Sequence, residues 1–155
     1  MSMASREKPA DPRRPVPRLY LVAPQDPAGL AERLAQALDA AEVAAVLLRL
    51  PQADERARVN HAKALAPTVQ GKGAALLLEG YPDLAARAGA DGAHLSGIEA
   101  FMTALATLKP ARIAGCGRLA TRHDAMVVAE AGADYVMFGE PDAARRGVGS
   151  TPHSQ

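Results

Sequence analysis

The sequence has no tryptophan, only 3% aromatic residues and a single cysteine among its 155 residues. A core with few large rings has to be built from Ala, Leu and Val, and this composition suits helices that pack closely on a sheet. The lone Cys116 excludes an internal disulfide and fits a reducing compartment. We therefore expect a cytoplasmic protein.

The chain also has no large excess of one charge sign and no long apolar run. The formal net charge is +1, and this near balance of charges favours neither nucleic acid nor an anionic membrane as a partner. No apolar run approaches the roughly 18–20 residues of a membrane span. The N-terminus is charged and rich in proline, and it lacks the apolar segment of a secretory signal. Apolar residues make up 48% of the chain, which indicates an ordinary globular domain.

Three parts of the chain differ in composition. Residues 1–18 combine prolines and arginines without apolar periodicity, and we predict a disordered basic tail there. Residues 19–141 contain the periodic apolar segments and are predicted to form the folded domain. Residues 142–155 hold glycines and arginines but no apolar run that could pair as a strand, so they are predicted to form a flexible tail.

One segment occurs twice, as Ala86–Leu95 and as Ala129–Phe138. Each copy predicts the end of an alanine-rich helix, a glycine, a short turn and an apolar strand. Gly89 and Gly132 stand where a helix end favours a left-handed backbone, and the aspartate two positions later is expected to open the strand. This helix-to-strand joint is typical of proteins that alternate strands and helices.

Continuous apolar runs predict strands that are covered on both faces, as in a parallel sheet. Six such runs are present: Leu19–Ala23, Ala44–Leu50, Ala74–Glu79, Gly92–Leu95, Ala111–Cys116 and Tyr135–Phe138. Apolar residues at helical spacing lie between them. Leu30, Leu34 and Leu38 are expected to form the buried stripe of one helix, and Phe101 and Met102 to fill the core from another. Asp26 with Pro27 is expected to start the first helix, and Thr121 with Asp124 resembles a capping box. A second helix, over residues 53–66, is expected to end before Pro67.

This alternation predicts an α/β fold with parallel strands and the curvature of a TIM barrel. Six βα units are present, whereas a closed eight-stranded barrel needs two more. The barrel is therefore predicted to be incomplete. An open flavodoxin-like sheet is an alternative with less support, because the first loop, 24–27, is not a phosphate-cradling sequence.

In either architecture the reactive groups belong at the carboxyl ends of the strands. The loop that contains Gly115, Gly117 and Arg118 could hold a phosphate through backbone N–H groups and the guanidinium, and Gly139 follows the sixth strand at the same edge. Ordinary turn chemistry is the other interpretation of these glycines. His94 lies inside an apolar strand and is interpreted as a packed, hydrogen-bonded histidine, and Cys116 as an inert thiol.

Several segments resemble the thiamine-phosphate synthase and thiazole tautomerase family. Ala90–Leu95 is similar to the family's G-A-D-G-V-H-L segment, and Gly132–Gly139 is similar to its G-A-D-Y-V-x-x-G-P segment. Leu19–Val22 resembles the family's opening strand, and Arg49 matches the arginine that ends its second strand. The resemblance runs from Leu19 to Pro141 in the family's order and spacing.

The resemblance implies a (β/α)8 barrel and a transferase of thiamine biosynthesis. Such an enzyme joins a pyrimidine pyrophosphate to a thiazole phosphate, and Mg²⁺ assists the departure of pyrophosphate. On this basis Arg49 is a candidate catalytic residue, and Glu79 and Glu99 are the candidate metal ligands. Arg118, from the glycine loop described above, is the second candidate catalytic residue. The partner is a phosphorylated small molecule.

Departures from the family's pattern predict a degenerate active site. The family's glutamine and lysine beside the matched arginine are Leu47 and Pro51 here, and its Asn-Asp pair is Glu79–Gly80. The closing strands with their phosphate site are absent from the sequence. Two functions stay open: synthesis of thiamine phosphate, or binding of a phosphorylated small molecule without that catalysis. The incomplete barrel predicts a homodimer across the gap or a C-terminal truncation.

Overall fold

The computed structural model describes residues 16–25 and 28–139. Strands and helices alternate along this part of the chain, as the apolar runs predict. The elements are β1 (Leu19–Ala23), α1 (Leu30–Ala40), β2 (Val43–Leu48), α2 (Glu55–Gln70), β3 (Ala75–Glu79), the short 3-10 helix η1 (Pro82–Leu84), α3 (Ala85–Ala88), β4 (Gly92–Ser96), α4 (Ile98–Leu108), β5 (Ile113–Gly117), α5 (Arg122–Ala131) and β6 (Tyr135–Val136).

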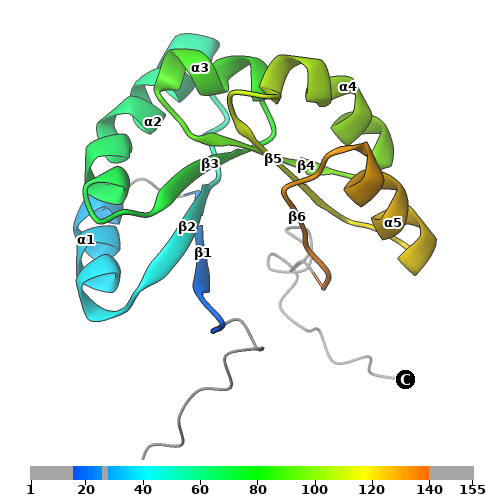
Figure 1. The fold of residues 1–155 in the computed structure, drawn as a ribbon. Coiled ribbons are helices and arrows are strands. Elements are labelled where there is room, and N and C mark those ends of the chain that lie inside the picture. Colours follow the sequence, from blue (N-terminus) through cyan, green and yellow to red (C-terminus); the bar gives the residue numbers. More distant parts are fainter. Residues whose placement is uncertain (1–15, 26–27, 140–155) are drawn as a thin grey trace, which may run out of the picture.

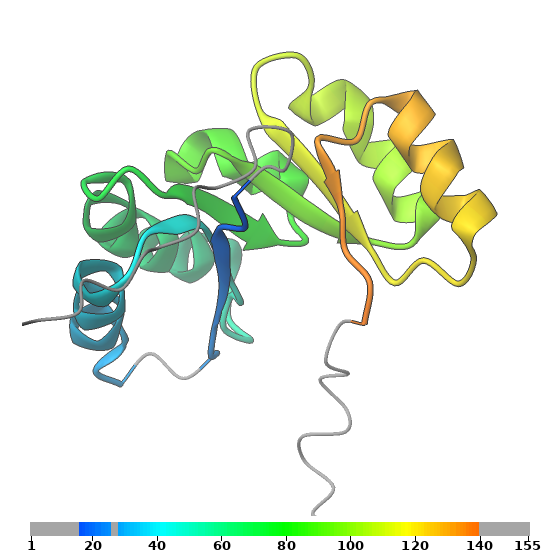
Figure 2. The same cartoon turned by 60° about the horizontal axis from the view of Figure 1, so that its bottom comes forward.

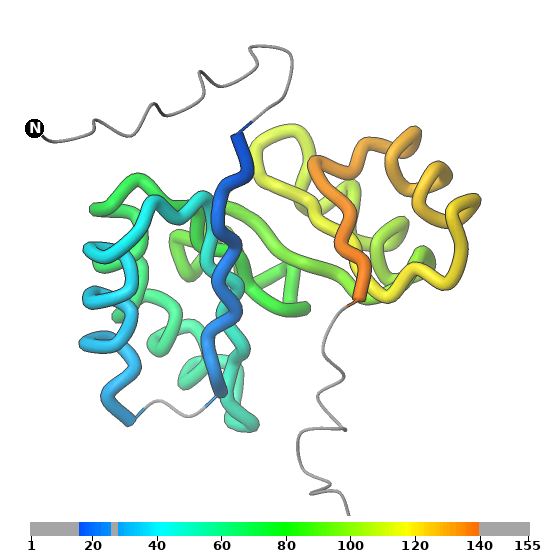
Figure 3. Tube along the Cα trace, turned by 90° about the horizontal axis from the view of Figure 1, so that it is seen from below, coloured from blue at the N-terminus to red at the C-terminus, as the bar shows by residue number. Residues whose placement is uncertain are grey.

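The six strands form one parallel sheet in the order of the sequence, from β1 to β6. The sheet is strongly curved, and the helices cover its convex side (Figure 1). Strands β1 and β6 border the open side of the curve, as the views from below show (Figures 2 and 3). The prediction of an incomplete, barrel-like α/β fold is therefore confirmed, and the alternative of a flavodoxin-like sheet is wrong because the strand order contains no reversal.

The main core lies between the sheet and the helices. In α1, the predicted stripe of Leu30, Leu34 and Leu38 is buried. Phe101 of α4 is fully buried, as predicted, whereas Met102 beside it is 46% exposed. The prediction that Met102 fills the core is wrong, because the side of α4 that carries it faces solvent.

A second, smaller core occupies the concave face of the sheet, where a closed barrel has its interior. Ala45, Leu47 and Leu77 are buried there. Partly buried side chains from neighbouring strands pack against them: Tyr20, Val22, Ala75, Ile113 and Tyr135. This core consists of strand residues only. It has an aliphatic part near β2 and β3 and an aromatic part where Tyr20 of β1 meets Tyr135 of β6.

Both copies of the repeated joint have the predicted geometry. Gly89 and Gly132 end their helices with positive φ angles of 69° and 121°. The carboxylate of Asp91 accepts a hydrogen bond from the backbone N–H of Leu76 at 2.7 Å. Asp134 accepts one from the N–H of Ala114 at 2.8 Å. Each aspartate thus ties the start of its own strand to the preceding strand.

The prediction that a helix ends before Pro67 is wrong. Helix α2 continues to Gln70 with Pro67 inside it. Proline has no N–H to donate to the Lys63 carbonyl, which removes one helical hydrogen bond. The last turn persists because Val69 is fully buried, a burial that contributes about 1.5–3 kcal/mol. In addition, the N–H of Gly71 donates to the Pro67 carbonyl at 2.9 Å.

Several predictions fall outside the described residues. These are most of the tail over residues 1–18, the tail over 142–155, and the helix start at Asp26 and Pro27. Within the described part, α1 begins at Leu30 after Gly29. No helix in this part is both long and apolar enough to cross a membrane. The cytoplasmic location stays a prediction.

Candidate functional site

The carboxyl ends of the six parallel strands form one rim, and two predicted site residues meet there. Arg49 directly follows β2, and Glu79 is the last residue of β3. The Arg49 Nε donates a hydrogen bond to the Glu79 Oε2 at 2.8 Å. The side chains are 18% and 33% exposed, so the pair is only partly accessible to water. A guanidinium and a carboxylate at this distance form a charge-assisted hydrogen bond.

The Arg49–Glu79 pair borders a small cleft of about 230 Å³. The cleft is lined by Gln25, Arg49, Leu50, Gln52, Glu79 and Tyr81. The Gln25 side chain donates to the Leu50 carbonyl at 3.0 Å, which holds the loop after β1 against the loop after β2. We call this space the Arg49 cleft. Its lining carries amide, phenol, guanidinium and carboxylate groups, which are suited to binding a small polar group.

Tyr81 is held in place at the edge of the Arg49 cleft. Its backbone has a φ of 52°, an uncommon value for a residue with a side chain. The Arg58 guanidinium carbon lies 4.5 Å from the centre of the Tyr81 ring, within the range of a cation–π interaction. The Arg58 Nε also donates to the Pro51 carbonyl at 3.3 Å. The loops after β2 and β3 are therefore joined by contacts of Arg49 and Arg58.

The predicted phosphate loop lies at the other end of the rim, after β5. Gly117 ends the strand, and its carbonyl accepts a hydrogen bond from the Gly97 N–H at 2.8 Å. Arg118 follows with a φ of 51°. The loop then leads to the first turn of α5, where Thr121 caps the helix by accepting from the Asp124 N–H at 3.1 Å, as predicted. A cationic residue thus stands between a strand end and a helix N-terminus.

Gly115 lies within strand β5, beneath an aromatic ring, rather than in the loop that follows the strand. It lies opposite both His94 and Tyr135 in the strand register. A Cβ atom built on Gly115 would lie only 2.1 Å from Cζ of the Tyr135 ring. The ring therefore lies directly over this glycine, and contact of phosphate with Gly115 stays a prediction. Contact of phosphate with Gly117 and Gly139, whose φ is 68°, stays a prediction.

Three side chains on the concave face are hydrogen-bonded to one another, and the sequence analysis did not predict this contact. The Tyr135 hydroxyl lies 2.8 Å from the His94 Nδ1 and 2.7 Å from the Tyr20 hydroxyl. The rings of His94 and Tyr135 stack with centroids 5.7 Å apart. We call these residues the Tyr–His chain. His94 is 1% exposed, so its interpretation as a packed, hydrogen-bonded histidine is confirmed.

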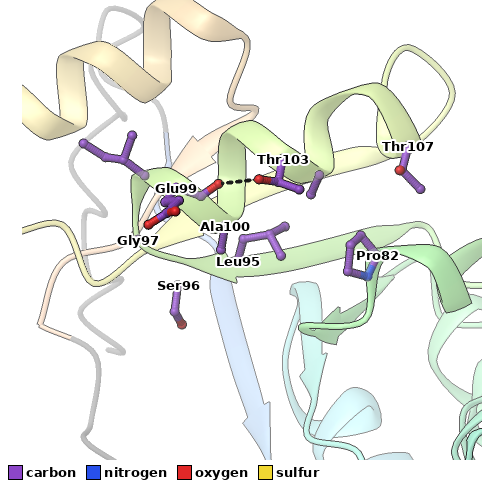
Figure 4. Close-up of a pocket in the computed structure, with 10 residues that line it drawn as sticks. Pro82, Leu95, Ser96, Gly97, Glu99, Ala100, Thr103 and Thr107 are labelled. Atoms are coloured by element: carbon purple, nitrogen blue, oxygen red, sulfur yellow. Dashed lines mark hydrogen bonds between the residues drawn. The ribbon is translucent and has the colours of Figure 1, made fainter.

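Glu99, the second candidate metal ligand, lies in the first turn of α4 and lines a different cavity from Glu79. This cavity has a volume of about 710 Å³ and lies between η1 and α4 (Figure 4). It is bordered by Pro82, Leu95, Thr103 and Thr107 among others, and the Thr103 hydroxyl donates to the Glu99 carbonyl at 3.0 Å. The structure therefore brings Glu79 to Arg49, and not to Glu99.

A magnesium site has little support in this arrangement. Within residues 16–25 and 28–139, no group of three or more His, Cys, Asp or Glu side chains could hold a metal ion. The Glu79 carboxylate is bonded to Arg49. As arranged, Glu79 and Glu99 do not form a shared set of ligands for Mg²⁺. Binding of Mg²⁺ by these two acids stays a prediction, and no chemical step is assigned to the ion here.

The two shifted pKa values lie away from the rim. Burial raises the pKa of Asp134, but hydrogen bonds from Lys109 and from the Ala114 N–H, together with the Lys109 charge, outweigh this effect and lower the pKa below its usual value. Burial lowers the pKa of His61 on α2, and its Nε2 has no hydrogen-bond partner. Cys116 is fully buried, which agrees with its interpretation as an inert thiol.

Comparison with known proteins identifies the family. A family model described as thiamine monophosphate synthase matches residues 19–144. A thiamine-phosphate synthase from Rhodospirillum centenum is 43% identical over 125 residues, which cover 79% of this chain and 60% of that protein. One from Hyphomonas neptunium is 36% identical over 134 residues, which cover 81% of this chain and 61% of that protein.

A solved structure supports the fold. The thiamine phosphate pyrophosphorylase from Pyrococcus furiosus superposes with a TM-score of 0.65 at 22% sequence identity. The matched part covers 79% of this chain and 60% of that one. The present chain thus spans about 60% of the length of the relatives it matches. The matched sequence, the parallel strand order and the curvature together show that the chain belongs to the thiamine monophosphate synthase family.

Proposed function

We propose that this chain binds a phosphorylated small molecule of thiamine biosynthesis at the carboxyl rim of its sheet, with the phosphate at Gly117 and Arg118. The observation that carries this proposal is the geometry after β5. There, Arg118 stands between the strand end and the capped N-terminus of α5. Backbone N–H groups and a guanidinium are the donors that proteins use for phosphate.

We further propose that the active site is degenerate and does not form thiamine phosphate at a family-like rate. Pyrophosphate departure needs cationic groups that are free to stabilise the leaving charge. In this structure the Arg49 Nε donates a hydrogen bond to Glu79, and Glu99 lines a separate cavity. This arrangement supports binding more than transfer. Synthesis of thiamine phosphate is the other function, and it is favoured by the identity with the two synthases.

Calorimetric titration with thiazole phosphate tests the binding proposal. We expect a single binding event that weakens at least tenfold in Arg118→Gln, because a charge-assisted hydrogen bond to phosphate contributes about 1.5–3 kcal/mol. Lys63→Gln is the matched control, since it removes the same charge from an exposed side chain of α2. Equal affinities for the unmodified chain and Arg118→Gln would contradict the proposed phosphate site.

Pyrophosphate release from the two family substrates, measured with Mg²⁺ present, separates the two functions. Our proposal predicts no release above the background of the uncatalysed reaction. Turnover at a rate typical of enzymes, about 1 per second or faster, would instead assign the synthase activity to this chain.

We also propose that the chain forms a homodimer through the open side of its sheet. Among the described residues, β1 pairs only with β2, and β6 pairs only with β5. Unpaired strand edges favour association with another chain. Light scattering during size-exclusion chromatography should give twice the 16.1 kDa chain mass, and a stable monomer would contradict the dimer.

A further inference from the structure

We infer that Glu79 determines which ligands the Arg49 cleft accepts, by excluding phosphate and pyrophosphate from Arg49 and leaving the cleft to an uncharged polar group. This inference rests on the proposed function in one respect, since it assumes that the phosphate binds at the β5 end of the rim. It adds a role for Glu79 as a specificity-determining residue.

The first step of the argument is the geometry of the ion pair. The carboxylate of Glu79 lies 2.8 Å from the Arg49 Nε, which is the distance of a charge-assisted hydrogen bond. A phosphate oxygen that approached this guanidinium would come close to a carboxylate oxygen. Both groups are anionic, and the side chains are mostly shielded from water, so the repulsion is not well screened.

The second step is the charge of the remaining lining. Besides the pair, the Arg49 cleft is lined by Gln25, Leu50, Gln52 and Tyr81, which add neither a carboxylate nor a basic side chain. Arg58 is close by, but it stacks on the Tyr81 ring and donates its Nε to the Pro51 carbonyl. The lining therefore has no net charge, and it offers both donors and acceptors.

The third step is the size of the cleft. A volume of about 230 Å³ is below the range of roughly 300–1,000 Å³ that is usual for complete ligand pockets. The Arg49 cleft therefore suits one part of a ligand, such as an amide or a hydroxyl-bearing ring. Such a group can donate a hydrogen bond to Glu79 and accept one from Arg49 at the same time.

Calorimetric titration with inorganic pyrophosphate tests this role. Glu79→Gln keeps an oxygen that can accept from the Arg49 Nε but removes the negative charge. We expect this variant to bind pyrophosphate at least tenfold more tightly than the unmodified chain, and the double variant Glu79→Gln with Arg49→Gln to lose the gain. An unchanged affinity in Glu79→Gln, or a gain that survives the loss of Arg49, overturns the inference.

Two further variants complete the test. Asp83→Asn removes the same charge from an exposed side chain of η1 outside the cleft, and its affinity should stay within twofold of the unmodified chain. A tenfold gain in this control would mean that net charge alone acts, which also overturns the inference. Arg49→Gln in the otherwise unmodified chain should change pyrophosphate affinity less than twofold. A tenfold loss there overturns the inference even if Glu79→Gln does not fold.

The proposed function and this inference fail in different ways. If the unmodified chain binds no phosphate compound, the proposed function fails, whereas the gain in Glu79→Gln still supports the role of Glu79. If binding at Arg118 is found but Glu79→Gln shows no gain, only the inference fails. Repeating Glu79→Gln together with Arg118→Gln isolates the Arg49 cleft, and the gain should persist there.

Discussion

The first three strands and the last three strands of the sheet carry different side chains on the concave face and at the rim. In the first half, the concave face is covered by aliphatic side chains such as Leu47 and Leu77, and the rim arginine is paired with a carboxylate. In the second half, the concave face carries His94 and Tyr135 of the Tyr–His chain, which Tyr20 of β1 completes from the other border of the open side, and the rim presents Gly117 and Arg118. The two halves share the alternation of strands and helices, but they differ in the polarity of the concave face and of the rim.

This difference shows how one repeated joint supports two kinds of surface. Asp91 and Asp134 tie their strands to the neighbouring strand in the same way. The residue that follows is Gly92 in one copy and Tyr135 in the other. The tyrosine reaches over Gly115 to His94, so the residue after the second joint places an aromatic ring and a hydroxyl on the concave face of the second half.

The largest expected effect comes from filling the space under Tyr135. Gly115→Ala places a Cβ 2.1 Å from the ring, which has to move and to give up its hydrogen bonds. We expect the free energy of unfolding to fall by about 3 kcal/mol, the upper part of the range for overpacked cores. Chemical denaturation measures this loss.

A double-mutant cycle shows whether the loss arises at the ring. In a background of Tyr135→Leu, the change Gly115→Ala should cost less than about 1 kcal/mol, because the clashing ring is absent. Equal costs in the two backgrounds would show that the ring does not lie over Gly115, and the contrast between the halves would be lost.

A smaller effect is expected from removing one hydroxyl of the Tyr–His chain. Tyr135→Phe keeps the ring but leaves His94 Nδ1 and the Tyr20 hydroxyl without this partner, and we expect a loss of about 1–2 kcal/mol in unfolding free energy. Tyr81→Phe is the matched control in the first half. Its ring, which Arg58 contacts, is retained, so its stability should change by less than about 0.5 kcal/mol. Equal losses in both variants would remove the distinction.

The smallest effect is a pH dependence in the second joint. The pKa of Asp134 is lower in the folded chain than in the unfolded chain, so the unfolded state binds more protons near pH 4. The stabilisation is complete above the unfolded pKa and is lost as the pH falls through the folded pKa. Because the side chain is 39% exposed, we expect only a few tenths of a kcal/mol.

Denaturation at pH 3 to 7 measures this dependence. Asp134→Asn should flatten the acid limb of stability against pH, and Lys109→Gln should reduce it, because Lys109 donates to both carboxylate oxygens at 2.9 and 2.8 Å. An acid limb of the same slope in Asp134→Asn would assign the dependence to other groups.

Local patterns predict much of this fold. The glycines at the joints, the Thr121 cap and the apolar strands are all recognisable from a few adjacent residues, and each is confirmed. The end of α2 is not, because the burial of Val69 in the core outweighs the local effect of Pro67. A tertiary contact of this kind cannot be read from the neighbouring residues.

The candidate site is predictable as a set of residues but not as an arrangement. Arg49 and Glu79 are recognised separately, yet their pairing depends on how far the ends of β2 and β3 reach along the rim. Glu99 is acidic and close to a strand end, but it belongs to α4 and lines the cavity beside η1. The Tyr–His chain joins residues from β1, β4 and β6, and its only signal is a polar side chain in each of three apolar strands.

The most direct test of the central claim is a map of backbone and arginine side-chain NMR signals during titration of the unmodified chain with thiazole phosphate. Our account predicts shifts at Gly117, Arg118 and the first turn of α5, while the Arg49 Nε–H signal keeps its position because its hydrogen bond to Glu79 is undisturbed. Shifts at Arg49 and Glu79 without any at Gly117 and Arg118 would place the phosphate at the opposite end of the rim and contradict the account.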